Sequence, residues 1–187
     1  GVCYFDNFHQ AMEISQEIVK LKPTCVELMD RNLLNLAKDI PMYAEGIKKY
    51  IKGNPAAVLM VEFIDTDQKV YEKKINDLEY IVLNQNNKNQ FKYYSDLNEQ
   101  KEVFDIRKAG LNILMSMKGD RKPVAFIEDC AVSLEHLADY TASLNEIFKK
   151  YGTSGMFYAH ASVGTLHVRP VLNMKSDNDL KNMKSIS

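Results

Sequence analysis

Two histidines near the C-terminal end of the chain have the spacing of a metal-binding pair. His160 and His167 lie in two short apolar runs separated by the four residues 162–165. If Ala161 pairs with Leu166 in an antiparallel hairpin, the two histidines face each other with Cβ atoms about 5 Å apart. Two imidazoles at that distance can bind one zinc ion, and a catalytic site would add a third protein ligand and an open position. The alternative is a cross-strand pair that only satisfies hydrogen bonds.

The same register gives the hairpin two different faces, because side chains alternate along a strand. Met156, Tyr158 and Arg169 share the face of the two histidines. The other face is apolar and consists of Phe157, Ala159, Ala161, Leu166, Val168 and Pro170. We therefore predict that one face belongs to the core and the other to a site. The remaining histidines, His9 and His136, fall in helical segments and are expected at the surface.

Arg107 is a candidate for binding a carboxylate. It lies beside an apolar helical stripe that runs through Val103 and Gly110. Glycine costs about 1 kcal/mol of helix propensity relative to alanine, which is consistent with the close approach of another group at Gly110. A guanidinium that emerges from a half-buried helix can hold a carboxylate through two hydrogen bonds. The alternative is an arginine that only extends over the edge of the core.

Two pairs of carboxylates follow predicted strands. Glu128 and Asp129 end one strand before a helix, and Glu27 and Asp30 have a similar position. Each pair could act as acids or ligands, or could order a turn by accepting hydrogen bonds from backbone N–H groups. The chain contains no GxGxxG, GxxxxGK, GxSxG or HExxH motif.

The composition is that of a globular protein with one domain. The chain has 187 residues, of which 24 are Lys or Arg and 25 are Asp or Glu, so it lacks the positive field that attracts nucleic acids. No apolar run approaches the 18 or so residues of a membrane-spanning helix. Cys3, Cys25 and Cys130 are far apart and predict buried free thiols in a reducing compartment. We expect a cytoplasmic protein, either free or peripheral to the inner membrane.

Short β-branched or aromatic runs alternate with segments of helical period. The predicted strands are 2–5, 25–29, 57–64, 91–94, 124–132, 156–161 and 166–172. The predicted helices are 8–21 with Asn7 as N-cap, a helix or helical pair at 32–51, and helices around 71–82, 103–117 and 134–151, with a polar loop at 84–90. Ser133 is placed at the start of the last helix and Gly152 at its end.

This alternation predicts an α+β fold of ferredoxin-like type. Two strand–helix–strand units, 2–29 and 57–94, have the pattern of split βαβ halves. The short loop between the last two strands favours a mainly antiparallel sheet of about seven strands with helices covering one face. We predict one domain over residues 1–175, followed by a polar tail, 176–187, that forms a truncated helix.

Several segments together resemble a known family. They are FIEDCAVSLEHL at 126–137, IRKAGL at 106–111, VELMD at 26–30 and AHASVGTLHVRPVL at 159–172. In this order and at these spacings they resemble the C-terminal domain of the FAD-linked oxidases. That family includes the flavin component of glycolate oxidase, D-lactate dehydrogenases and D-2-hydroxyglutarate dehydrogenase. The resemblance covers the chain from about Val2 to Lys175.

The resemblance implies a cap domain that closes a substrate site over the FAD of a separate N-terminal domain. It places the family's His-x6-His motif on His160 and His167, which would bind a divalent metal, expected to be zinc, that holds a 2-hydroxy acid. It places a contact to the substrate carboxylate on Arg107. The hairpin departs from the commoner family pattern at Ala159 and in the loop 162–165, and in this it resembles long members fused to iron–sulfur domains.

The resemblance also implies that part of the protein lies outside this chain. A later Gly-Glu-His-Gly motif, which supplies a carboxylate ligand and a catalytic histidine in the family, would follow residue 187, and no flavin domain is present. We therefore expect a fragment of a flavin-dependent D-2-hydroxy acid dehydrogenase that transfers hydride to FAD and is inactive by itself. The alternative from another class is a non-catalytic ferredoxin-like module that binds a protein.

Overall fold

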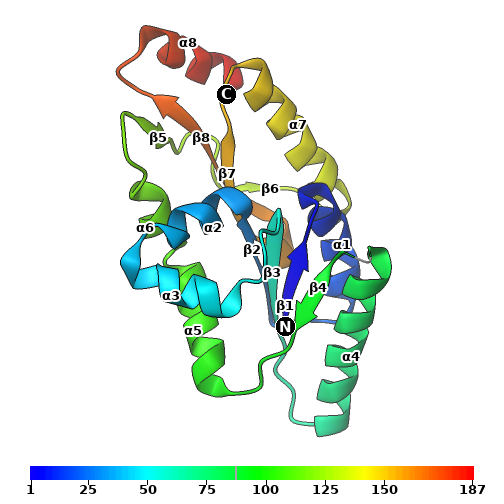
Figure 1. Ribbon diagram of the computed structural model, residues 1–187. Coiled ribbons are helices and arrows are strands. Elements are labelled where there is room, and N and C mark those ends of the chain that lie inside the picture. Colours follow the sequence, from blue (N-terminus) through cyan, green and yellow to red (C-terminus); the bar gives the residue numbers. More distant parts are fainter. Residues whose placement is uncertain (87) are drawn as a thin grey trace.

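The computed structural model describes residues 1–86 and 88–187 and shows a mainly antiparallel sheet with helices packed against it (Figure 1). The strand order is β4-β1-β3-β2-β7-β8-β5, with β6 also paired to β8, and every pairing is antiparallel. The strands are β1 (Val2–Phe5), β2 (Cys25–Asp30), β3 (Ala57–Glu62), β4 (Gln90–Lys92), β5 (Arg121–Pro123), β6 (Cys130–Ala131), β7 (Gly155–His160) and β8 (Thr165–Asn173). The predicted α+β class is confirmed.

The helices form where the apolar period predicts them. They are α1 (Phe8–Lys20), α2 (Arg31–Lys38), α3 (Pro41–Tyr50), α4 (Gln68–Gln85), α5 (Leu97–Lys108), α6 (Gly110–Met115), α7 (Leu137–Lys150) and α8 (Asp177–Ile186), with short 3-10 helices η1 (Leu134–His136) and η2 (Ala161–Val163). Asn7 caps α1 as predicted, since its side chain accepts a hydrogen bond from the backbone N–H of Gln10. The polar tail forms α8, whose Ile186 is buried in the core.

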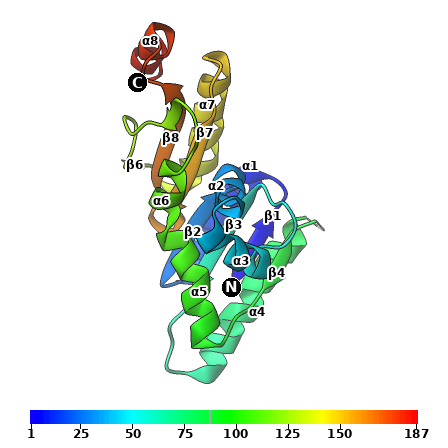
Figure 2. The ribbon, with the colours of Figure 1, turned by 60° about the vertical axis from the view of Figure 1, so that its left-hand side comes forward.

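The first half of the chain has the ferredoxin-like order. The units β1-α1-β2 and β3-α4-β4 interleave so that the strands lie in the order β4-β1-β3-β2. This confirms the two split βαβ halves. The β7–β8 hairpin then extends the sheet beyond β2, and Figure 2 shows how this lengthens the molecule toward α7 and α8.

The helices cover both faces of the sheet, whereas the sequence predicts helices on one face. The α1, α4 and α7 helices pack on one face around Cys3, Leu59 and Phe157. The α2, α3, α5 and α6 helices pack on the other face around Tyr4, Met60 and Tyr158, and the two groups lie on opposite sides of the sheet in Figure 1. Successive residues of the central strands point to opposite faces of the sheet, and the residues on both faces are apolar. A layer of helices can therefore pack on each face. The face that carries the two histidines is therefore core along part of its length.

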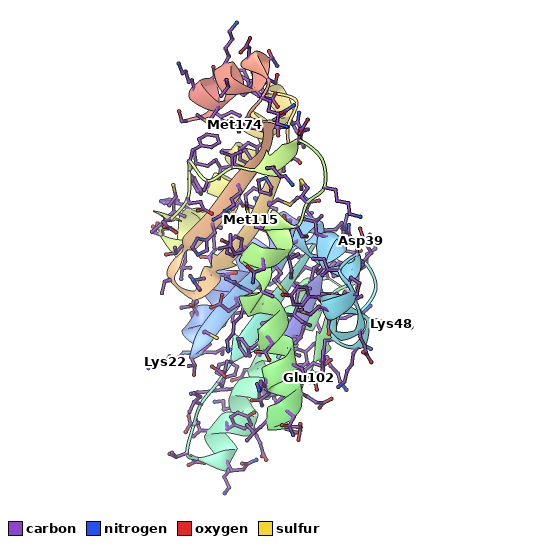
Figure 3. The ribbon with its side chains drawn as sticks, turned by 90° about the vertical axis from the view of Figure 1, so that its left-hand side faces the viewer. Lys22, Asp39, Lys48, Glu102, Met115 and Met174 are labelled. Carbon is purple, nitrogen blue, oxygen red and sulfur yellow. The ribbon has the colours of Figure 1, made fainter. Side chains whose placement is uncertain are left out.

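Two predicted elements are divided. The helix expected at 103–117 is interrupted at Ala109, and α5 and α6 follow one another across the face of the sheet (Figure 3).

The strand expected at 124–132 is reduced to β6, and residues 124–129 leave the sheet. Asp129 has a positive φ of 59°, which an extended strand does not allow. The predicted loop 84–90 is shorter, because α4 continues to Gln85 and β4 begins at Gln90, and residue 87 lies outside the described residues.

No helix in the described part of the chain has the length and hydropathy that crossing a membrane requires. The three cysteines are free thiols: Cys3 is buried, whereas Cys25 and Cys130 are partly buried. Burial raises the pKa of the Cys3 thiol to about 12. Cys3 is therefore uncharged and unreactive in the neutral pH range.

Asp30 joins the end of β2 to its neighbours. One carboxylate oxygen accepts a hydrogen bond from the backbone N–H of Leu33 at 2.8 Å, which caps α2, and the other accepts from the backbone N–H of Phe157 at 3.0 Å. Burial raises the pKa of Asp30 to about 7, although these hydrogen bonds act in the opposite direction.

Asp30→Asn tests this raised pKa. In the native protein Asp30 keeps its proton up to about pH 7, whereas in the unfolded chain its side chain ionises near pH 3.9. The stabilisation of the fold by this protonated group is therefore complete below about pH 4 and is lost as the pH rises through about 7. The variant cannot ionise and leaves one N–H without an acceptor, which costs about 1 to 2 kcal/mol. We expect it to be less stable than the native protein at pH 4, with the difference shrinking toward pH 8. Urea unfolding at both pH values measures this, and a constant difference would contradict it.

Candidate functional site

The β7–β8 hairpin presents the two predicted histidines on one face. Tyr158 pairs with His167 and His160 with Thr165, so the register is shifted by two residues from the predicted pairing of the two histidines. A shift of two residues leaves every side chain on its predicted face, because the strand period is two. The imidazole centroids are 5.4 Å apart, with the rings nearly perpendicular at 79°.

The hairpin turn is a 3-10 turn that ends at Gly164, which explains the difference in register. Gly164 has a φ of +67°, and a Cβ at this position would lie 2.0 Å from the carbonyl oxygen of Val132. Only glycine fits there, because both the backbone conformation and the close approach exclude a side chain. Ala161 is therefore part of the turn, whereas the sequence predicts that it pairs with Leu166 in the strand.

Glu27 connects the first histidine to Arg107. It lies on β2, where it is the backbone partner of His160 on β7. Its Oε1 lies 2.9 Å from Nδ1 of His160, and its Oε2 lies 2.8 Å from Nη2 of Arg107. Arg107 comes from the last turn of α5 and is buried, with 8% of its surface exposed. This ion pair compensates a cation that would otherwise be costly to bury.

The guanidinium of Arg107 has unused donor groups. Its Nη2 also lies 3.5 Å from the carbonyl oxygen of Ala159, while its Nε is buried and has no hydrogen-bond partner among the described residues. The contact of Nη2 with Glu27 is close, but Oε2 of Glu27 does not have the angles of a hydrogen bond. Arg107 is thus held by its charge contact with Glu27, and some of its N–H groups have no hydrogen-bond acceptor among the described residues.

Tyr158 links this pair to the second histidine. Its ring is stacked on His167 with centroids 4.6 Å apart and planes 23° apart, and the guanidinium carbon of Arg107 lies 5.1 Å from the ring centroid. Since β7 lies between β2 and β8, Tyr158 occupies the centre of the group. The aromatic ring thus fixes the orientation of His167 and contacts the cation.

The segment before β6 supplies two more carboxylates. Oδ1 of Asp129 lies 2.9 Å from Nδ1 of His167, and Glu128 forms a two-pronged ion pair with Arg169 on the same strand as His167. Met115, labelled at the end of α6 in Figure 3, brings its sulfur to 3.9 Å from Nη1 of Arg169. Burial lowers the pKa of His167 below its usual value, and the charge of Asp129 partly opposes this.

Each of the two imidazoles places Nδ1 against a carboxylate, Glu27 for His160 and Asp129 for His167, which leaves both Nε2 atoms available. A carboxylate on the second ring nitrogen is the usual support of a ligating histidine, so the two rings could bind a metal ion. No group of three or more His, Cys, Asp or Glu that could hold a metal ion occurs within residues 1–86 and 88–187.

The structure brings most of the sequence candidates together and separates a few. His160, His167, Arg107, Glu27, Glu128 and Asp129 share one region. Asp30 lies apart and orders the turn into α2. His9 and His136 lie at the surface, with side chains 43% and 69% exposed, as predicted. Sequence reasoning placed Tyr158 and Arg169 on the correct face but gave them no partners, because the stacking and the ion pair depend on the register and on the path of residues 124–129.

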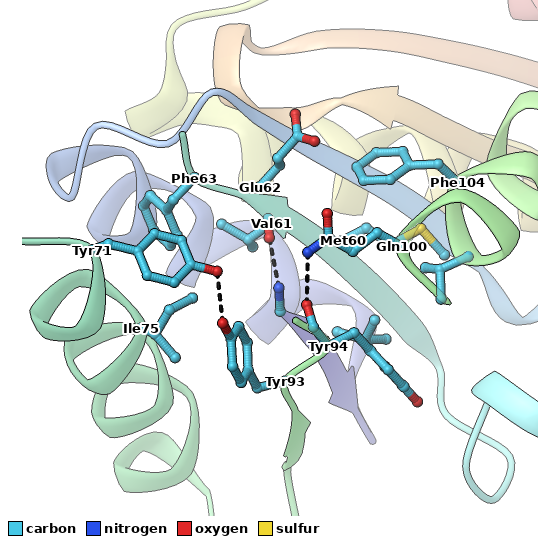
Figure 4. A pocket seen from close by; sticks show the side chains of 13 residues that line it. Met60, Val61, Glu62, Phe63, Tyr71, Ile75, Tyr93, Tyr94, Gln100 and Phe104 are labelled. Carbon is cyan, nitrogen blue, oxygen red and sulfur yellow. Dashed lines mark hydrogen bonds between the residues drawn. The ribbon is translucent and has the colours of Figure 1, made fainter. Parts of the chain in front are cut away.

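A separate pocket lies away from these residues, at the start of β1 and the end of β3, between α4 on one face of the sheet and α5 on the other. It is lined by residues of β1, β3, α4 and α5 and by Tyr93 and Tyr94 after β4 (Figure 4). Its walls hold the hydroxyl–hydroxyl hydrogen bond of Tyr71 and Tyr93 at 2.8 Å and the bond from Gln100 to the carbonyl of Tyr94 at 2.9 Å. It contains neither a histidine nor an arginine. The candidate site is consequently the open surface around the hairpin.

The sequence of the whole chain matches one protein family. The family model described as "FAD linked oxidases, C-terminal domain" matches residues 1–187. The chain belongs to this family. This confirms the resemblance that the sequence segments indicated, and it favours the oxidase interpretation over a non-catalytic module.

Two curated relatives are similar to nearly the whole chain. D-2-hydroxyglutarate dehydrogenases of Pantoea ananatis (strain AJ13355) and Escherichia coli (strain K12) are each 29% identical over 192 residues, which is 98% of this chain and 19% of the relative. This C-terminal domain thus spans about a fifth of the curated relatives it matches. The solved structure of 4-ethylphenol oxidase from Gulosibacter chungangensis has the same fold, with a TM-score of 0.63 and 10% identity over 99% of this chain and 41% of that chain.

Asp129→Asn tests the electrostatics around His167. The native carboxylate favours the imidazolium, so its removal should lower the pKa of His167 further below the usual value of about 6.5. The pKa is read from the pH dependence of the His167 ring resonances in NMR spectra. Asp139→Asn, which lies near His9, is the matched control and should leave His167 unchanged. A pKa that rises or stays the same in Asp129→Asn would contradict the assigned contact.

Proposed function

We propose that this domain binds the carboxylate end of a 2-hydroxy acid in a flavin-dependent D-2-hydroxy acid dehydrogenase. The observation that carries the proposal is that Arg107, His160 and His167 meet on one face of the sheet, linked through Glu27 and Tyr158. The name shared by the long relatives, D-2-hydroxyglutarate dehydrogenase, supports this class of substrate. D-lactate and glycolate belong to the same class and differ in the group attached to the hydroxyl-bearing carbon.

Arg107 is the group that would hold the substrate carboxylate. Its charge is already balanced by Glu27, so the carboxylate would use Nη1, the donor that Glu27 leaves free and that is not fully enclosed. Such an arrangement keeps the guanidinium in place before substrate arrives, which lowers the entropy lost on binding. Glu27 at the same time keeps Nδ1 of His160 occupied, so Nε2 is the ring nitrogen that remains available.

His160 and His167 are the residues that would hold a divalent metal, with zinc as the first choice. Both present Nε2 with Nδ1 supported by a carboxylate, which fits the donor set of a zinc site with a further ligand from outside this chain. When bound, such a metal supplies a Lewis acid that polarises the substrate hydroxyl. Around it, Asp129 holds the ring of His167, and the stack with Tyr158 limits the rotation of that ring.

The remaining parts of the enzyme belong to the same proposal. FAD, held by a separate domain of the parent protein, supplies the hydride acceptor. The small share of each relative that this chain covers leaves ample length for that domain, for a catalytic histidine and carboxylate ligand after residue 187, and for an iron–sulfur domain. The domain limit at residue 175 and the cytoplasmic location, free or peripheral to the inner membrane, stay predictions.

Arg107→Lys in the full-length protein tests substrate binding. A lysine keeps the charge but cannot offer the same fixed donors, so we expect kcat/KM for the 2-hydroxy acid to fall by about 10-fold to 100-fold. Arg31→Lys is the matched control, because Arg31 bonds the carbonyl of Pro55 outside the site. Steady-state kinetics measure both variants. Native kinetics in Arg107→Lys would reject a role in substrate binding.

His160→Ala and His167→Ala test the metal site. Each should abolish most Zn(II) binding in calorimetric titration, whereas His136→Ala, at an exposed histidine, should not. Binding to the native protein should weaken as the pH falls through the imidazole range, since a ligating nitrogen must be unprotonated. Equal affinity in all three variants would refute the metal assignment.

A further inference from the structure

Tyr158 has a hydroxyl group that the proposed function does not use. The residue is 7% exposed, and its ring is fixed by His167 and by Arg107. Two other tyrosines buried on this side differ: the hydroxyl of Tyr4 donates to the carbonyl of Tyr50, and the hydroxyl of Tyr50 donates to Glu102. The hydroxyl of Tyr158 makes no hydrogen bond to any described residue, and it is not among the fully enclosed unpaired atoms. It therefore reaches the surface of the site with its donor free.

The charged groups near Tyr158 come from three elements. They are Arg107 of α5, Arg169 of β8, and Glu128 and Asp129 of the segment before β6. Both carboxylates are already engaged, Glu128 by Arg169 and Asp129 by His167. The donors without a partner among the described residues that are not fully enclosed are the hydroxyl of Tyr158 and Nη1 of Arg107. Two unused donors beside a cation form a site for an anion.

A phenol donates a strong hydrogen bond to a carboxylate and adds no charge that would repel it.

We propose that Tyr158 is a substrate-contacting residue whose hydroxyl donates a hydrogen bond to the carboxylate held by Arg107. The inference rests on the proposed function and deepens it. Its occupant is the carboxylate of a 2-hydroxy acid or of the 2-oxo acid product, since both carry this group next to the reacting carbon. Arg107 supplies the charge, and Tyr158 fixes the rotation of the carboxylate relative to the two histidines.

Tyr158→Phe in the full-length enzyme separates the hydroxyl from the ring. Phenylalanine keeps the stack on His167 and the contact with Arg107 and removes only the donor. A hydrogen bond to a charged group is worth about 1.5 to 3 kcal/mol, so we expect the KM for the 2-hydroxy acid and the Kd for the 2-oxo acid to rise about 10-fold or more. The Zn(II) affinity and the pKa of His167 should stay native. Tyr43→Phe, on α3 at the edge of the same core, is the matched control and should change none of these values.

The outcomes distinguish this inference from the proposed function. Native KM and Kd in Tyr158→Phe, together with weakened binding in Arg107→Lys, would overturn the role of Tyr158 alone. Native binding in both variants would overturn the carboxylate site itself. A loss of Zn(II) affinity or a shifted pKa of His167 in Tyr158→Phe would show that the tyrosine acts through the histidine, and would also overturn a direct contact with substrate.

Discussion

The ion pair of Glu27 with Arg107 is the interaction on which the site depends. A guanidinium buried to this degree needs a compensating charge, because removing it from water costs several kcal/mol. Glu27 provides that charge from a central strand and shares its second oxygen with His160. One carboxylate thereby sets the position of the cation from α5 and the orientation of an imidazole from β7. Without Glu27, the only polar contact between the helix and the hairpin at this point in the described residues would be the 3.5 Å contact of Arg107 with the carbonyl oxygen of Ala159.

Carboxylates also contact the side chains of β8, the second strand of the hairpin. Arg169 and His167 lie two residues apart on β8 and contact the consecutive carboxylates Glu128 and Asp129. Asp129 reaches His167 because its positive φ turns the chain out of the strand that its neighbours would otherwise form. The interrupted strand is thus the structural condition for the contact of Asp129 with His167.

Two polar atoms of the Glu27–Arg107 pair have no hydrogen-bond partner among the described residues. They are Nε of Arg107 and Oε2 of Glu27, and both are buried. Polar groups that a folded domain leaves unpaired are costly unless water or a ligand satisfies them. These atoms lie beside His160, in the region where we propose that substrate binds.

The sequence by itself determined the alternation of strands and helices, the ferredoxin-like first half and the side of the hairpin on which each residue lies. These features follow from local periodicity: a strand has a period of two, so even a register error of two residues left His160, His167, Tyr158 and Arg169 on their predicted face.

The tertiary structure decided which charges meet. The contact of Glu27 with Arg107 joins residues 80 positions apart, and that of Glu128 with Arg169 joins residues 41 positions apart. Such pairings depend on strand order, on the break between α5 and α6 and on the turn at Gly164, where one carbonyl oxygen excludes any side chain. The same long-range packing placed helices on both faces of the sheet, because apolar residues on alternate sides of a strand do not specify how many layers will cover them.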